Sequence, residues 1–528
     1  IAYKLFSNCT GLEKITIPDT VTTIKGNAFY ECSNLSKVKL SENLTVIEAD
    51  AFQECNSLQN IELPEGLSEI KDRAFYQCSN LKEIKIPDSV TKIEGSAFYE
   101  CKKLQNVTLS KNLESLGSST FGNCDGLTQI EIPKSLERAG DDYFASYAPG
   151  AFSGCKNLKN VSFEAGTTVI AYKLFSNCTG LEKITIPDTV TTIKGYAFYE
   201  CSNLKEIQIG NGLKEIGDSV FYECTSLQKV LFPDKVNSMG TSIFYNCINL
   251  TEVHLPNIRQ NIMANTFYNC KKLTTINFPS TLTTIGDSAF YGCESLPEAI
   301  LPSGVEKIES NAFKNCKSLK KAVVPDTVSS IGSSAFYGCE ALTDITLGSK
   351  LKKIDSQTFY GCTALPSIVI PYNVTTIGDS AFVNCTKLTQ ITVPRNTASI
   401  ESNVFSYPRK MTMYGPSGCY AQTYANGKGI KYVAQDIHAT SIRLDITNKT
   451  AEYYDEFQLT ATIAPQNFTD AVTWTSSNED VATVSDTGYV EVCGVGTAVI
   501  TVTAGNVKAA CTVTVPQLID WIEFDEDE

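Results

Sequence analysis

Histidine, the side chain most often used for acid–base catalysis near neutral pH, occurs only twice in this chain, as His254 and His438. The 20 cysteines include no Cys-x-x-Cys pair, the usual spacing of structural zinc ligands and of redox dithiols. The sequence also lacks Gly-x-Ser-x-Gly, His-Glu-x-x-His and a phosphate-binding loop. We therefore expect a protein that is not an enzyme and that uses no cofactor and no catalytic metal.

The charge distribution excludes further classes of protein. Acidic residues outnumber basic residues by 58 to 44, and residues 436–528 alone hold 16 acidic and 3 basic residues. A nucleic-acid partner is not expected, because binding to phosphates requires cationic groups. The apolar runs are too short to cross a membrane, so we expect no membrane insertion. No secretion signal or wall-sorting motif is visible, and we expect both to lie outside this chain.

The spacing of the cysteines reveals the unit that organises the chain. Seventeen of the 20 cysteines, from Cys9 to Cys385, recur every 23 residues, with one longer gap of 31 residues between Cys124 and Cys155. Counted from each Cys, Leu stands at +3, apolar residues at +6 and +8, often Pro at +9, and Ala-Phe at +19 and +20. In a short strand, +6 and +8 face one side and +7 faces the other, and Pro at +9 ends the strand. One such coil cannot enclose a core, so successive coils must stack.

This pattern resembles the BspA-type leucine-rich repeat of bacterial and some protist surface proteins. The resemblance implies a mainly β fold, a right-handed leucine-rich-repeat solenoid of about 17 turns of 23 residues over residues 1–407. Residues 408–434 resemble the C-terminal cap of the family, which we interpret as strand, short helix and strand. Residues 1–35 match residues 170–204 at all positions except Asn27, and the chain starts within a repeat. We therefore expect the solenoid to be N-terminally truncated.

A second domain is predicted after a linker at residues 435–439. Residues 440–516 contain strands with strict alternation, such as Cys511-Thr-Val-Thr-Val515, and the segment Thr473-Trp-Thr-Ser-Ser-Asn478. These segments resemble the bacterial Ig-like domain, group 2. The resemblance implies a small β-sandwich in which Trp474 belongs to the core, and a module that serves as a spacer on cell-surface or secreted proteins. Residues 517–528 form an acidic tail that we expect to be solvated.

The repeated cysteines allow two interpretations. Thiols in successive turns would be separated by about 4.8 Å with parallel Cα–Cβ vectors, which is poor geometry for a disulfide. We therefore expect buried, unpaired thiols rather than a redox or metal array. Pairing of Cys493 with Cys511 in the second domain remains open.

Candidate binding residues are sought at the outward positions of the solenoid, because the inward ones form the core. Position +7 is polar in the first eight turns, whereas four later residues there are apolar. An exposed apolar face of this kind marks a binding surface, although β-propensity alone would also explain it. The candidate strand face comprises Leu231, His254, Asn277, Ile300, Val323 and Val369.

Two further candidates are aromatic. At +21, five consecutive turns carry tyrosine, which would offer a platform to sugars or peptides or would simply pack beside the Phe at +20. This Tyr ladder comprises Tyr199, Tyr222, Tyr245, Tyr268 and Tyr291. The gap of 31 residues implies an insert of eight residues, which we place near 145–152, with Tyr143 and Tyr147 as its candidate contacts.

The sequence as a whole favours an extracellular or cell-surface binding protein. Its solenoid would adhere to a host, matrix or neighbouring-cell protein or to a glycan. The alternative is a structural surface scaffold or spacer without a specific ligand, and a remote alternative is an accessory part of a surface enzyme. The oligomeric state is left open.

Overall fold

The computed structural model describes residues 1–140, 149–257, 261–435, 437–466 and 468–517. The chain divides into two compact units, one of residues 1–296 with 312–317 and the other of residues 297–311 with 318–528. Both units contain stacked 23-residue turns, and the second also contains the cap and an antiparallel β region. The expected mainly β solenoid is confirmed, and it has about 18 turns where about 17 were expected. Each turn is named below after the Cys with which its numbering starts.

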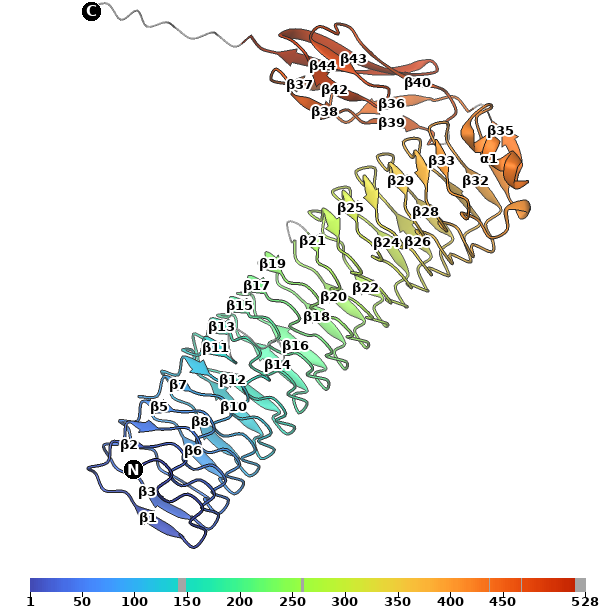
Figure 1. Ribbon diagram of the computed structural model, residues 1–528. Helices are drawn as coiled ribbons and strands as arrows, with labels where there is room; N and C mark the ends of the chain where they lie inside the picture. The colour runs from blue at the N-terminus through green and yellow to red at the C-terminus, as the bar shows by residue number, and fades with distance from the viewer. Residues whose placement is uncertain (141–148, 258–260, 436, 467, 518–528) are drawn as a thin grey trace, which may run out of the picture. The chain divides into compact units, whose positions relative to one another are not determined.

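In the first unit, every turn except the Cys55 turn contributes a strand at positions +5 to +8. These strands are parallel, and paired residues differ by 23 in number, or by 31 where the chain is longer. Figure 1 shows them along one side of the turns. They are β1 (Lys14–Thr16), β3 (Lys37–Lys39), β6 (Glu83–Lys85), β8 (Asn106–Thr108), β10 (Gln129–Ile132), β12 (Asn160–Phe163), β14 (Lys183–Ile186), β16 (Glu206–Ile209), β18 (Lys229–Leu231), β20 (Glu252–His254) and β22 (Thr275–Ile276).

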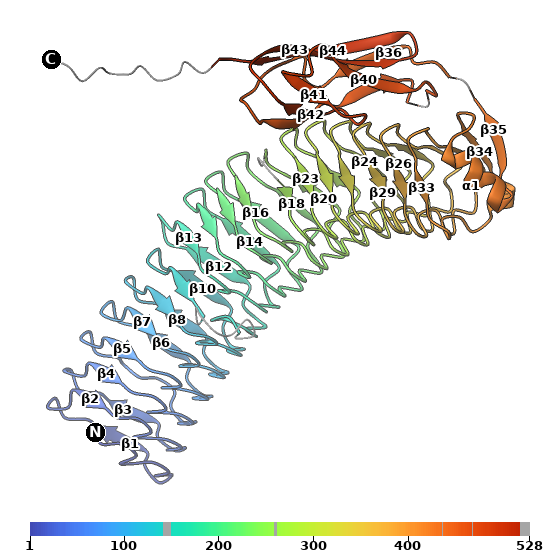
Figure 2. The ribbon, with the colours of Figure 1, turned by 45° about the horizontal axis from the view of Figure 1, so that its top comes forward.

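A second set of strands, each of two residues, forms where the chain of each turn runs back. The inward residue of each strand is the apolar residue at +15. This residue is buried in most turns, as Ile24 and Ile193 are. Figure 2 shows this set separate from the longer strands. It comprises β2 (Thr23–Ile24), β4 (Val46–Ile47), β5 (Glu69–Ile70), β7 (Lys92–Ile93), β9 (Ser115–Leu116), β11 (Arg138–Ala139), β13 (Val169–Ile170), β15 (Thr192–Ile193), β17 (Glu215–Ile216), β19 (Ser238–Met239), β21 (Asn261–Ile262) and β23 (Thr284–Ile285).

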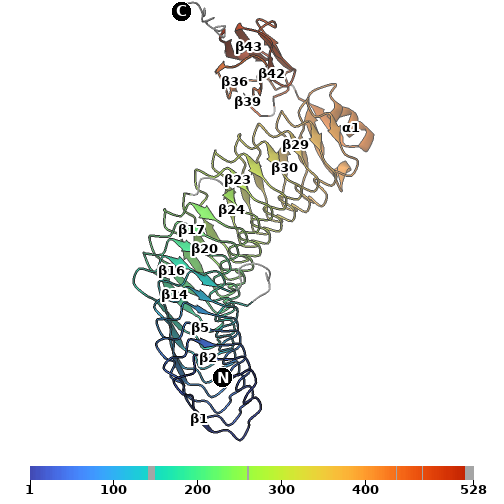
Figure 3. The same cartoon turned by 60° about the vertical axis from the view of Figure 1, so that its left-hand side comes forward.

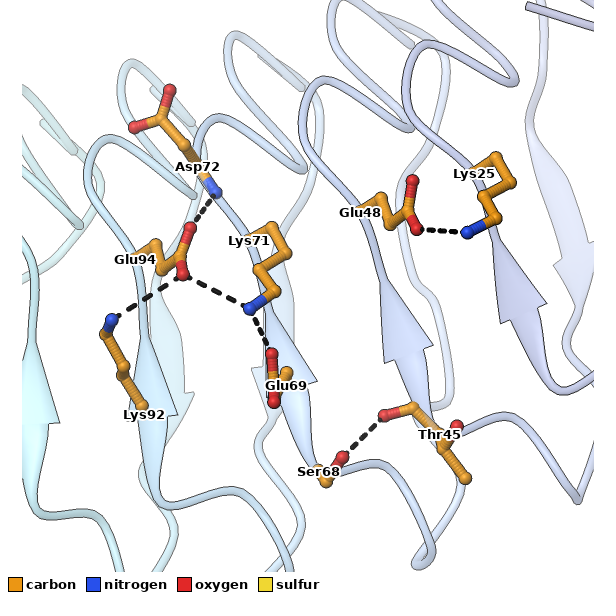
Figure 4. A network of polar contacts seen from close by, with 9 residues as sticks. All are labelled: Lys25, Thr45, Glu48, Ser68, Glu69, Lys71, Asp72, Lys92 and Glu94. Carbon is orange, nitrogen blue, oxygen red and sulfur yellow. Dashed lines mark hydrogen bonds and ion pairs between the residues drawn. The ribbon is translucent and has the colours of Figure 1, made fainter. Parts of the chain in front are cut away.

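An alternating charge pattern follows position +16 of the first four turns, outside the core. Lys25, Glu48, Lys71 and Glu94 stand one turn apart, and Figure 4 shows them facing one another. Lys25 Nζ lies 2.7 Å from Glu48 Oε1, and Lys71 Nζ lies 3.3 Å from Glu94 Oε1. The hydrogen bond from Lys25 is the main reason why the pKa of Glu48 lies below its usual value. The pairs are partly exposed, so each stabilises the fold by at most about 1 kcal/mol.

The core of the turns is a stack of phenylalanine rings at position +20. Rings of successive turns lie nearly parallel, with centroids 5.0 Å apart for Phe29 and Phe52 and 5.9 Å apart for Phe152 and Phe175. The rings from Phe29 to Phe290 in this unit are fully buried. Burial of such a side chain stabilises the fold by about 1.5–3 kcal/mol relative to exposure. The stack thus links each turn to both of its neighbours.

The thiols at the repeat position are free and, apart from the exposed Cys9, buried. This confirms the expected array of unpaired cysteines. Most of the buried thiols have a partner that the sequence analysis did not anticipate, because each donates a hydrogen bond to the carbonyl of a Phe 26 residues earlier in the chain. The Sγ–O distance is 3.1 Å from Cys78 to Phe52 and 3.0 Å from Cys247 to Phe221. In the second domain Cys493 is exposed and Cys511 is buried, and the two are not paired.

Burial of these thiols predicts a loss of stability at alkaline pH. Desolvation raises the pKa of Cys78, Cys155 and Cys201 to about 12 each. Thiols of the unfolded chain ionise near pH 8.5. The folded state therefore binds more protons above that value, and the free energy of unfolding falls as the pH rises from about 9 to about 12.

Urea denaturation in steps of pH from 8 to 11 measures this effect. In the variant Cys78→Ala/Cys155→Ala/Cys201→Ala, the decrease above pH 9 is expected to be shallower, by up to about 1.4 kcal/mol per pH unit for each thiol removed. Equal slopes for the variant and the parent chain would contradict the assignment to thiols.

The solenoid turns of the second unit repeat the same elements. The longer strands are β24 (Glu298–Ile300), β26 (Lys321–Val323), β28 (Asp344–Thr346), β30 (Ser367–Val369) and β32 (Gln390–Thr392). The two-residue strands are β25 (Lys307–Ile308), β27 (Ser330–Ile331), β29 (Lys353–Ile354), β31 (Thr376–Ile377) and β33 (Ser399–Ile400). Phe336, Phe359, Phe382 and Phe405 continue the ring stacking at 5.4–5.7 Å.

The cap has the expected order of strand, helix and strand. A 3-10 turn at Pro408–Lys410 precedes β34 (Thr412–Gly415), α1 (Tyr420–Lys428) and β35 (Lys431–Ala434). Strand β34 pairs with β32, so it extends the sheet of the last turns, and Figure 3 shows α1 beside them. The helix ends at Gly429, whose φ of 68° is the left-handed conformation common after a helix. Ala421 and Ala425 face inward and are fully buried.

The Ig-like region is an antiparallel β structure with its own core, which includes Leu459, Ile500 and Val513. Trp474 packs against this core, in agreement with the expectation. One sheet has the order β37 (Asn448–Thr450), β44 (Val507–Val515), β43 (Gly496–Ala504) and β40 (Val472–Ser476). The others are β38 (Glu456–Gln458), β42 (Tyr489–Val492) and β41 (Ala482–Val484), and the pair β36 (Ser441–Leu444) and β39 (Ala461–Ala464). Residues 518–528 of the acidic tail lie outside the described residues.

Candidate binding surfaces

The strand face consists of the +7 side chains, which point away from the core because their neighbours at +6 and +8 point into it. Leu231, Ile300 and Val369 have exposed fractions of 49%, 43% and 37%, high for large apolar side chains. Val323 is half-buried, and His254 is exposed. Leu231, Ile300 and Val369 therefore carry the apolar character that the sequence predicted for these outward positions.

The strand pairing determines which of these residues are neighbours. In the first unit, Leu231 of β18 pairs with His254 of β20. In the second unit, Ile300 of β24 pairs with Val323 of β26, whereas Val369 of β30 pairs with Thr392. Ile300 and Val323 are therefore the two apolar side chains that lie side by side, whereas Leu231 and Val369 each have a polar partner.

Asn277 is occupied within the fold. Its Oδ1 accepts a hydrogen bond from the Leu255 N–H at 2.7 Å, and its Nδ2 donates to the Leu255 carbonyl at 2.9 Å. The amide thus replaces a strand contact to the preceding turn and is half-buried. The position of Asn277 in the repeat could not reveal this, because the bonds depend on the spacing between two turns.

The Tyr ladder forms, and its geometry limits what it can bind. The rings of Tyr222, Tyr245, Tyr268 and Tyr291 lie 4.5 Å apart in succession and are almost parallel. Each ring face is therefore covered by the next tyrosine, so a ligand can reach only ring edges and hydroxyl groups. Burial, followed by the neighbouring Tyr245, raises the pKa of Tyr222 to about 12, and the phenol stays neutral.

The insert is placed differently from the expectation. Ala151 and Phe152 are fully buried, and the Phe152 ring stacks between Phe121 and Phe175. They fill the Ala-Phe positions of the Cys124 turn, so the extra residues lie before Ala151 and not at 145–152. An inward Phe contributes to the ring stack, and that contact outweighs the sequence likeness of Tyr143-Phe144 to the motif. Tyr143 and Tyr147 lie outside the described residues.

Concave sites on the strand face were not identified from the sequence. One, of about 670 Å³, is lined by residues of the Cys32 and Cys55 turns, including Lys37, Lys39 and Glu62. A second, of about 510 Å³, lies over the Cys101, Cys124 and Cys155 turns, and a third, of about 230 Å³, over the Cys155, Cys178 and Cys201 turns. All three are lined mainly by polar side chains from outward strand positions.

The described residues contain no cluster of three or more His, Cys, Asp or Glu side chains arranged to hold a metal ion. In the same part of the chain, no helix has the length and apolar character that crossing a membrane requires.

Comparison with known proteins identifies the family. The model of the BspA type leucine rich repeat region matches residues 1–107, 70–149, 148–251, 237–327 and 283–412. The chain belongs to this family. Residues 438–515 match the bacterial Ig-like domain, group 2. Both resemblances drawn from the repeat and from the Thr473–Asn478 segment are thus confirmed.

Several solved structures are similar to this chain, among them bacterial leucine-rich-repeat proteins. One from Bacteroides ovatus is 26% identical, with 80% of this chain and 92% of that chain covered and a TM-score of 0.45. A leucine rich cell surface protein from Faecalibacterium prausnitzii is 26% identical, with 78% and 81% covered and a TM-score of 0.28. The pneumococcal vaccine antigen PcpA is 19% identical, with 81% and 90% covered and a TM-score of 0.38.

Among curated proteins, a lacto-N-biosidase of Bifidobacterium bifidum is 48% identical over 61 residues. This similarity covers 11% of the present chain and 6% of that protein.

Proposed function

We propose that this chain is an extracellular or cell-surface binding protein whose solenoid adheres to a protein or a glycan. Membership of a repeat family with surface proteins among its similar structures supports an interaction role. The observation that carries the proposal is the exposure of Leu231 in the first unit and of Ile300 and Val369 in the second, at outward strand positions that the core does not require to be apolar. Exposed apolar side chains in contact with a partner lose water on binding, which favours association.

This assignment also sets the role of the other parts. The Ig-like domain would hold the solenoid away from the surface to which the whole protein is attached. The partner would be a host, matrix or neighbouring-cell molecule. A non-catalytic role is consistent with the family and with the scarcity of histidine.

The variant Leu231→Thr/Ile300→Thr/Val369→Thr is expected to lose binding to a protein partner at least tenfold while its melting temperature stays within about 2 °C of that of the parent chain. Threonine retains β-propensity, so only the apolar contact is removed. The measurement is a binding screen of the immobilised chain against extracellular-matrix proteins, followed by affinity measurements on the proteins that bind.

The matched control is Lys39→Thr/Lys85→Thr, which changes the same strand position in polar turns. Binding that falls in the control but not in the apolar variant would place the contact elsewhere on the solenoid. Failure of any partner to bind either protein would favour the structural scaffold.

A further inference from the structure

The pairing of the longer strands is interrupted at intervals. Within the described residues, no strand pairing links β8 to β10, β12 to β14, β22 to β24, or β28 to β30. Residues 60–63 form no strand, so the Cys55 turn pairs with neither β3 nor β6. Between β16 and β18 the pairing is reduced to Glu206 and Lys229. Backbone N–H and C=O groups that would otherwise join neighbouring turns are therefore left open on the strand face.

A sequence feature accompanies five of these seven interruptions, whereas the other two follow the Cys55 and Cys270 turns, which have Pro64 and Pro279 at +9. Most turns have Pro at +9, but five do not. Each of the five lies directly before a missing or reduced pairing. The residues at +9 in these turns are Ser41, Ser110, Glu164, Gly210 and Gly348.

The turns without Pro lie close to the preceding turn. A Cβ atom at Gly348 would stand 2.0 Å from the Pro325 carbonyl oxygen, and Ser110 is fully buried. The backbone N–H after Ser110, that of Lys111, donates to Asp88 of the preceding turn at 2.9 Å. Glu164 uses its own N–H, which Pro lacks, to bond the Ile132 carbonyl at 2.9 Å. These contacts hold such a turn against the preceding turn. No continuous strand pairing holds it to the following turn, and an opening is left between these two.

The opening is confined to the strand face. Across the interruption between the Cys101 and Cys124 turns, the Phe121 and Phe152 rings remain 5.4 Å apart. An additional strand between two turns would require about 4.8 Å more. A ligand at this opening would therefore lie over it and reach into it with polar groups, and would not insert as a strand.

The site over the Cys101, Cys124 and Cys155 turns has a distinctive composition, and we name it the amide groove. Its volume is about 510 Å³, within the range of small-ligand sites. Its outward side chains are amides and hydroxyls with one carboxylate, Glu131, and no cation. They are Gln105, Asn106, Thr108, Gln129, Glu131, Asn160 and Ser162.

This composition selects one class of ligand. Amide side chains both donate and accept hydrogen bonds, as sugar hydroxyls do. The absence of cationic side chains from the lining disfavours phosphorylated, sulfated or carboxylated ligands, and the absence of aromatic side chains disfavours a protein hot spot. By contrast, the site between the Cys32 and Cys55 turns is lined by lysines and glutamates, suited to charged partners.

We propose that the amide groove binds a neutral saccharide. The inference rests on the proposed function, because it assigns the glycan part of that role to a site of its own. It does not involve Leu231, Ile300 or Val369, so the two sites can be tested separately.

The test uses the full chain on an array of neutral, sialylated and sulfated oligosaccharides, followed by affinity measurements on the neutral ones that bind. The variant Asn106→Ala/Gln129→Ala/Asn160→Ala is expected to lose at least tenfold in affinity for them, with an unchanged melting temperature. The variant Ser110→Pro keeps these three amides and introduces the residue found at +9 in most turns. It is expected to close the opening and also to weaken saccharide binding at least tenfold.

The control is Leu231→Thr/Ile300→Thr/Val369→Thr, which should retain saccharide binding even if it loses a protein partner. The inference is overturned if the neutral oligosaccharides do not bind, if only acidic ones bind, or if the Asn106/Gln129/Asn160 variant binds them normally. None of these results affects binding of a protein through Leu231, Ile300 and Val369. Failure of the saccharide inference and failure of the proposed function are therefore distinguishable.

Discussion

Replacement of Phe244 by alanine is expected to lower the free energy of unfolding by about 3–5 kcal/mol. The Phe244 side chain is fully buried, and its ring lies 5.6 Å from Phe221 and 5.5 Å from Phe267. Removal of the ring leaves a cavity between two stacked rings that are held in place by their own turns. The cavity cannot be filled by collapse, since the backbone bonds between turns fix the spacing, so the full cost is retained.

Chemical denaturation of the parent chain and the variant measures this loss. In a stacked-repeat protein the damage also weakens both interfaces of the altered turn, so we expect an earlier and broader transition. Leu231→Ala in the same turn is the control, because truncation of this exposed side chain should cost no more than about 0.5 kcal/mol. Comparable losses for the two variants would show that the Phe stack is not the main source of cohesion.

Replacement of Gly348 by alanine is the second large effect that we expect. The new Cβ would meet the Pro325 carbonyl oxygen at 2.0 Å, and both partners belong to the backbone of adjacent turns. Neither can rotate away as a flexible side chain would, so the turns must separate. Overpacking of this kind costs about 1–3 kcal/mol or more. The result also bears on the amide groove, because close approach at +9 is the cause assigned to the interrupted pairing.

Gly66→Ala provides a matched control, since a Cβ at Gly66 would meet no atom within 4 Å and its φ is not in the left-handed region. This variant should be neutral or more stable by up to about 1 kcal/mol, through reduced freedom of the unfolded chain. Thermal and urea denaturation of both variants give the comparison. If Gly348→Ala were as stable as the parent chain, the close approach at +9 could not be the cause of the interrupted pairing.

Particular residues show how far the sequence leads. The Cys spacing predicts the stacking of turns, and the Phe at +20 and the outward direction of Leu231 follow from it, because every turn gives a side chain the same surroundings. The same logic predicts unpaired thiols at one position. It does not reveal that Cys78 donates to the Phe52 carbonyl, since that bond depends on the distance between two turns.

The Tyr ladder and Asn277 illustrate the limit in a second way. The repeat places Tyr222 and Tyr245 one above the other, but only the 4.5 Å separation shows that each ring covers the next. Asn277 occupies an outward position in the pattern and yet serves the backbone of the preceding turn. Whether an outward side chain is available to a ligand is a property of its neighbours and not of its place in the repeat.

The sequence by itself determined the family, the number and inward positions of the turns, the cap and the Ig-like region, because periodic burial of apolar residues leaves little choice of fold. The tertiary structure alone decided where the strand face opens. The signal at Ser110 and Gly348, a missing Pro, is present in the sequence, but its meaning depends on contacts between residues of adjacent turns. Residues that lack the proline ring and keep a backbone N–H allow one turn to approach its predecessor, and the space left behind becomes the groove that we assign to a saccharide.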